Sequence, residues 1–129
     1  DAQLAWLAAD LKQRKPDDKI VVFTHRPLFD LVPNWDWTTA DGAKAIDILM
    51  PSKNVVVFYG HIHQEHHHMT GHIAHHAAKS LIFPQVPPGD APRRPPPPAF
   101  DATLKPLGTR DVAVGGPKVA ITEIPVTKA

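Results

Sequence analysis

Histidines follow the two most apolar runs of the sequence. His61 and His63 come directly after the run 55–59, and His25 ends the run 20–24 in the same way. Open α/β sheets usually bind their ligands at the carboxyl ends of the strands. The imidazoles at the carboxyl ends of these two runs are therefore candidates for a shared site. We therefore predict a metal site at which His25, His61 and His63 are ligands.

The remaining histidines are concentrated in one segment. Eight of the nine histidines lie between positions 61 and 76, and the chain has no cysteine, so any metal must be held by imidazole and carboxylate groups. This composition also permits a His-rich module that buffers Zn, Ni or Cu without catalysis. We expect the other histidines to alternate along strands near a polar site: His66, His67 and His68 partly exposed, and His72, His75 and His76 on a strand surface or hydrogen-bonded in the core.

Composition sets the broad class of the protein. A chain of 129 residues is one domain or part of one, and 43% hydrophobic residues are enough for a core. The 14 basic and 13 acidic residues nearly cancel, which gives no electrostatic case for nucleic acid or an anionic membrane. The sequence contains no apolar stretch long enough to span a bilayer. No basic region typical of a signal peptide is visible at the amino terminus.

The first half of the chain predicts an alternation of helices and strands. Apolar residues at positions 4, 7, 8 and 11 have helical spacing, with Asp1 as the N-cap and Pro16 at the end. Residues 19–25 and 54–59 read as strands that are apolar on both faces, as interior strands are. The connection between them contains an apolar loop that we expect to pack against the protein. The connection is then expected to continue as a helix that is capped by Thr38 or Thr39 and ends at Pro51. The order strand, helix, strand predicts that the two strands are parallel neighbours.

The second half has different patterns. Segments 65–69 and 72–77 flank Thr70-Gly71 and predict a hairpin, and residues 80–83 are expected to be extended. Eight prolines between positions 84 and 98 predict a stiff polyproline connector, with a ligand for a proline-binding domain as the alternative. A closing strand is predicted at 119–124, after a turn at 115–117.

Three segments together resemble a known family. The helix Gln3-Leu4-Ala5-Trp6-Leu7, the strand end Val21-Val22-Phe23-Thr24-His25-Arg26-Pro27-Leu28 and the strand end Val57-Phe58-Tyr59-Gly60-His61-Ile62-His63 are similar to the carboxy-terminal half of calcineurin-like metallophosphoesterases. The resemblance covers roughly residues 3–83. It implies an α/β fold that is part of a four-layer αββα sandwich, here with a β-rich, proline-rich C-terminal tail. It also implies hydrolysis of phosphate mono- or diesters at two metal ions, which would be Fe, Mn or Zn.

The resemblance assigns roles to the three strand-end histidines. His25 matches a ligand of the second metal, His61 matches another ligand of that metal, and His63 matches a ligand of the first metal. The family's Asp-x-His, Gly-Asp-x-x-Asp and Gly-Asn-His-Asp or Gly-Asn-His-Glu motifs do not occur in this sequence. We therefore expect that no catalytic residue can be assigned here, that substrate-binding residues cannot be named, and that the chain alone is inactive without the missing N-terminal half.

The resemblance also suggests an organisation and a location. Residues 1–86 would be the carboxy-terminal part of the metallophosphoesterase domain, 87–106 a proline-rich connector, and 107–129 an extended or β segment of the same domain. The expected partners are a phosphate ester and the missing half. A structural fragment that is stable only beside another chain is a further alternative. The hairpin and tail look like those of exported bacterial relatives, so an exported or periplasmic location is the expectation.

Overall fold

The protein has an α/β fold, as predicted. A computed structural model describes residues 1–87, 92–93, 96 and 107–127. In chain order the elements are α1 (Ala2–Leu11), β1 (Lys19–Thr24), α2 (Gly42–Leu49), β2 (Asn54–Tyr59), β3 (His66–Thr70), β4 (Ile73–Ala77), β5 (Gly108–Ala113) and β6 (Ala120–Pro125). Most of the predicted proline connector lies outside the described residues.

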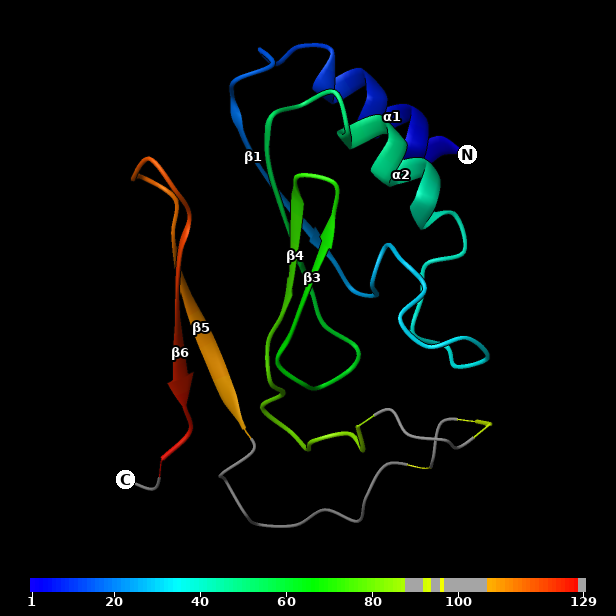
Figure 1. Ribbon diagram of the computed structural model, residues 1–129, viewed down its shortest axis with the longest axis vertical. Coiled ribbons are helices and arrows are strands. Elements are labelled where there is room, and N and C mark those ends of the chain that lie inside the picture. The colour runs from blue at the N-terminus through cyan, green and yellow to red at the C-terminus, as the bar shows by residue number, and fades with distance from the viewer. Residues whose placement is uncertain (88–91, 94–95, 97–106, 128–129) are drawn as a thin grey trace.

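Two sheets organise these elements. The larger sheet has the strand order β1-β2-β4-β3, in which β1, β2 and β4 run parallel and β3 is antiparallel to β4. Strands β5 and β6 form a separate antiparallel pair. The helices lie on one side of the larger sheet and the β5–β6 pair lies on the other (Figure 1). The parallel pairing of β1 with β2 confirms the arrangement predicted from the strand, helix, strand order.

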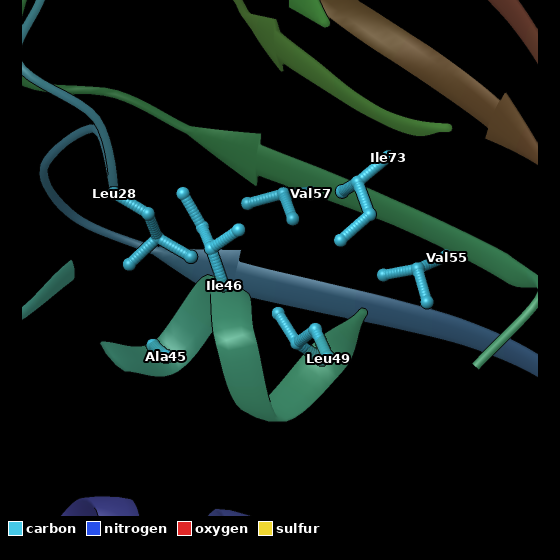
Figure 2. Close-up of a cluster of buried hydrophobic side chains, with 7 residues drawn as sticks. All are labelled: Leu28, Ala45, Ile46, Leu49, Val55, Val57 and Ile73. Atoms are coloured by element: carbon cyan, nitrogen blue, oxygen red, sulfur yellow. The ribbon is translucent and has the colours of Figure 1, made fainter. Parts of the chain in front are cut away.

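The core lies between α2 and the larger sheet. Ile46 and Leu49 of α2 face Val55 and Val57 of β2, and Ile73 of β4 extends the same cluster (Figure 2). These strand residues share a face because side chains alternate along a strand. The leucines of α1 pack against this cluster from outside. The buried face of α2 therefore consists of Gly42, Ala45, Ile46 and Leu49.

The helix ends differ in part from the prediction. Asp1 caps α1 by accepting a hydrogen bond from the backbone N–H of Gln3 at 2.9 Å, as predicted, but the helix ends at Leu11. The cap of α2 is Asp41, and its side chain makes no cap bond, so the prediction of Thr38 or Thr39 was wrong. Thr39 instead donates its backbone N–H to the carbonyl of Pro27 at 2.8 Å. That bond ties it to the segment that follows β1.

The prediction that β1 is an interior strand was wrong for the described structure. β1 lies at the edge of the sheet, and Phe23 is 76% exposed. Trp6 of α1 is likewise 68% exposed. Among residues 1–87 and 107–127, no element covers these apolar groups. An apolar run in a sequence predicts that its side chains are buried, but it does not identify the element that covers them.

The hairpin turn and the closing strand are each shifted by one residue from the prediction, and one strand of the tail was not predicted. The β3–β4 pairing extends to Thr70 opposite Ile73, so the turn is Gly71-His72, one residue later than predicted. Gly71 has φ +60°, which glycine adopts without steric cost. Residues 80–83 form bends rather than a strand. β5 was not predicted, whereas β6 lies within one residue of the predicted closing strand.

Gly42 provides a test of the packing between α2 and the segment after β1. A Cβ at position 42 would lie 2.1 Å from the carbonyl oxygen of Leu28, and backbone cannot yield as a flexible side chain does. We expect Gly42→Ala to lower the free energy of unfolding by about 2 kcal/mol or more, despite the higher helix propensity of alanine. In the control Gly115→Ala nothing lies within 4 Å of the new Cβ, so denaturant unfolding should be nearly unchanged. Equal effects would contradict the close approach.

Candidate metal centre

Backbone pairing brings His25 and His61 together. The parallel ladder of β1 and β2 ends with Thr24 opposite Tyr59, and the next residue continues it: the N–H of Gly60 donates to the carbonyl of His25 at 3.0 Å. The Nε2 atom of His25 then lies 3.2 Å from Nδ1 of His61, with the rings nearly perpendicular. The sequence prediction that these two side chains share one sheet end is confirmed.

The turn that carries His61 and His63 has an uncommon backbone. His61 has φ 65° and His63 has φ 54°. The N–H of Ile62 donates to the carbonyl of Gly60 at 2.7 Å, so His61 is the centre of a three-residue γ-turn. Among the described residues, only Asn34 is a further non-glycine residue with positive φ. Such strain costs on the order of 1–3 kcal/mol per residue and persists only where neighbouring contacts enforce it.

Ile62 anchors this turn between the two histidines. Its side chain is fully buried in a second apolar cluster with Trp35, Trp37, Tyr59 and Ala77. The tryptophans belong to the apolar loop after β1, so the prediction that this loop packs against the protein is confirmed. Burial of the residue between His61 and His63 therefore fixes the backbone that carries both imidazoles.

Asp36 is a group at this site that the sequence analysis missed. Its Oδ2 lies 3.4 Å from Nε2 of His61, and Arg26 donates to its backbone carbonyl at 2.9 Å. The carboxylate thus lies on the Nε2 side of the His61 ring, whereas Nδ1 faces His25. A carboxylate beside the far nitrogen is common for metal-binding histidines. The feature of the sequence that could have identified Asp36 is its position between Trp35 and Trp37. These two tryptophans hold the loop against the core.

His63 is oriented by a different contact. Its Nδ1 lies 2.9 Å from the carbonyl oxygen of Phe83, and its ring lies beside the Phe83 ring with centroids 4.6 Å apart. The carbonyl can only accept, so Nδ1 carries the proton and Nε2 has the free lone pair. Orientation by a backbone carbonyl is typical of metal-ligating histidines.

The described residues supply part of a ligand set. Two nitrogens bound to one tetrahedral ion at about 2.0–2.1 Å lie about 3.3 Å apart, which is close to the separation of the facing nitrogens of His25 and His61. However, no three His, Asp or Glu side chains within the described part of the chain are grouped so that they could hold a metal ion. The structure therefore brings two of the three predicted ligands together, and metal ligation by His25, His61 and His63 stays a prediction.

The hairpin places three other histidines under the loop that follows β1. Phe29 stacks on His68 with centroids 3.8 Å apart and meets the edge of His75 at 5.2 Å. His75 is fully buried, and neither of its ring nitrogens has a hydrogen-bond partner among the residues that the structure describes. The expectation that His75 lies on a surface or is hydrogen-bonded in the core was therefore wrong. An apolar neighbour on the loop, rather than a polar site, covers this face.

Tyr59 completes this layer of neutral side chains. Its hydroxyl is hydrogen-bonded to Nδ1 of His66 at 2.7 Å, and burial raises the pKa of Tyr59 far above its ordinary value, so the hydroxyl stays protonated. Burial, followed by the charges of His68 and His67, lowers the pKa of His66. On the helix side of the hairpin, Tyr59, His66 and His75 are therefore neutral at physiological pH.

Comparison with known proteins gives no match: no protein-family model fits the sequence, and no curated protein is significantly similar to it. In the described part of the chain, no helix has the length and apolar character needed to cross a membrane.

His75 makes the stability of the protein depend on pH. Burial, followed by the charges of His68 and His76, lowers its pKa to about 4, whereas an unfolded histidine titrates near 6.5. Below pH 6.5 the unfolded state therefore binds more protons than the folded state, and stability is lost as the pH falls towards 4. We expect this group alone to remove about 3 kcal/mol from the free energy of unfolding over that window.

The test is urea unfolding between pH 7 and 4.5. His75→Leu should flatten the pH dependence while largely retaining stability at pH 7, because the ring nitrogens make no hydrogen bond. The exposed residue His72 provides the control, and His72→Leu should leave the slope as it is. A slope in His75→Leu as steep as that of the unmodified protein would contradict the assignment.

Proposed function

We propose that the chain is the carboxy-terminal half of a calcineurin-like metallophosphoesterase domain that hydrolyses phosphate mono- or diesters. His25, His61 and His63 would be its contribution to a two-metal site. The observation that carries this proposal is the pair of imidazole nitrogens 3.2 Å apart at the ends of two neighbouring parallel strands. The strained backbone at His61 supports it, because strain of this kind clusters at functional sites.

The layers of the structure are consistent with a four-layer αββα sandwich. Two helices, the larger sheet and the β5–β6 pair lie in that order, which would supply one helix layer, one complete sheet and two strands of the second sheet. The exposure of Phe23 and Trp6 is what such a fold predicts for groups that the other half covers. This supports a partner polypeptide beside β1.

The three histidines would supply part of the ligand set of a two-metal centre. Nε2 of His25 and Nδ1 of His61 would hold one ion, and Nε2 of His63 would hold its neighbour. Bound Fe, Mn or Zn would neutralise phosphate charge and lower the pKa of a water molecule to produce a nucleophile. Neutral imidazoles cannot offset the charge of two such ions, so carboxylate ligands must come from polypeptide outside these 129 residues. Asp36 would orient His61 by accepting its Nε2 proton.

Replacement of His61 tests the proposal in the longer protein that carries the missing motifs. Asparagine tolerates positive φ better than most residues, so His61→Asn removes the imidazole with little cost to the turn. We expect hydrolysis of a generic phosphodiester with Mn²⁺ to fall on the order of 100-fold or more, because an ion is lost or misplaced. His72→Asn, on the hairpin turn, is the matched control. Equal losses in both variants would favour diffuse metal binding.

The 129-residue chain alone provides a second test. Within its described residues no group of three ligands is formed, so we expect no turnover with added Mn, Fe or Zn. Turnover should be found when the chain is joined to a segment with the family's aspartate and asparagine motifs. Robust metal-dependent hydrolysis by the short chain would show that it is a complete small enzyme.

A further inference from the structure

Two histidines outside the proposed centre meet on the opposite face of the hairpin. His67 of β3 and His76 of β4 are directly opposite each other in the antiparallel ladder. Their Nδ1 atoms are 2.6 Å apart, and their rings are nearly perpendicular. His68 and His75 point to the helix side, so this pair faces the side on which β5 and β6 lie (Figure 1).

The pair lines a cleft in which basic residues outnumber acidic ones, with Lys19, Lys53, Lys118 and Arg110 against Glu65 and Glu123. The cleft, about 800 Å³ in volume, lies between the larger sheet and the β5–β6 pair. Arg110 donates through Nε to Glu123, and its Nη2 lies 3.3 Å from Oε1 of Glu65. Two carboxylates and one guanidinium are therefore paired beside the two imidazoles. Binding of a cation here would depend on the imidazole lone pairs and not on the charge of the cleft.

Glu65 also determines which nitrogen of His67 is protonated. Its Oε1 lies 3.3 Å from Nε2 of His67, and an ionised carboxylate can only accept, so Nε2 carries the proton. The Nδ1 atom of His67 therefore presents a lone pair to His76. A carboxylate on the far nitrogen is the usual arrangement of a histidine that binds a metal.

His76 is also neutral near physiological pH. Burial, followed by the charges of His67 and Arg110, lowers the pKa of His76. When no ion is bound, the proton on Nδ1 of His76 can lie between this atom and Nδ1 of His67. Two nitrogens on one ion would lie about 3.3 Å apart. The rings would therefore have to separate by less than an ångström, and the side chain of His67, which is 54% exposed, has room to move.

We propose that His67 and His76 form a second metal site, for one divalent cation of the Zn²⁺, Ni²⁺ or Cu²⁺ class that imidazole prefers. The cation replaces the proton between the two Nδ1 atoms. His76 loses that proton to water and gains one on Nε2, so both rings stay neutral. No third His, Asp or Glu ligand is grouped with this pair among the described residues, so water from the cleft completes the coordination. An ion held in this way exchanges readily.

The test is calorimetric titration of the full chain with Zn²⁺ alone. The titration uses a background with His61→Asn and His63→Asn, so the result does not depend on whether the proposed phosphoesterase centre exists. We expect one Zn²⁺ per chain in this background. His67→Gln should weaken Zn²⁺ binding at least tenfold. Glu65→Leu removes the carboxylate that orients His67 and should weaken Zn²⁺ binding about tenfold.

Matched controls separate this site from general binding to a His-rich surface. His72 lies on the same hairpin but its Nε2 is bonded to the carbonyl of Ser52 at 2.7 Å, so His72→Gln should change the affinity less than twofold. Circular dichroism and thermal melting should show that His67→Gln folds as the background does, since the substitution is at an exposed position. An affinity unchanged by His67→Gln, or equally weakened by His72→Gln, would overturn the proposal.

Discussion

The parallel pairing of β1 with β2 determines where His25 and His61 lie. Its register places Thr24 opposite Tyr59, and the hydrogen bond from Gly60 to His25 carries the pairing one residue past both strands. A shift of this register by one residue would move alternate side chains to the opposite face of the sheet. The imidazoles of His25 and His61 would then no longer face each other. The core beneath α2 is what enforces the register, because Val55 and Val57 must stay on its side.

The γ-turn at His61 depends on the second apolar cluster. Positive φ at His61 and His63 costs on the order of 1–3 kcal/mol per residue. Full burial of one isoleucine side chain contributes about 1.5–3 kcal/mol. Ile62 alone therefore offsets roughly one of the two strained residues. The tryptophans that enclose it, Trp35 and Trp37, are part of what maintains the turn.

Local patterns in the sequence were sufficient for the parts of the structure that depend on neighbouring residues. The apolar run of β2, the Asp1 cap and the strand-end positions of His25 and His61 all follow from short-range spacing. Contacts between distant segments were not predictable in this way. Asp36 reaches His61 through a loop whose path is set by buried tryptophans, and no periodicity encodes that path. The edge position of β1 likewise depends on which segments pair with it.

Strand geometry divides the His-rich hairpin into two sets with different chemistry. The set under Phe29 is desolvated, and His75 has no hydrogen-bond partner, so its rings contribute packing and a pH-dependent stability. The opposite set, His67 and His76, shares a cleft with Glu65, which can orient the imidazole of His67. The number of histidines in the hairpin therefore exceeds the number that could bind a metal. Because side chains alternate along a strand, the two sets face opposite sides, and among the described hairpin histidines His67 combines a lone pair directed at a second ring with a carboxylate on its other nitrogen.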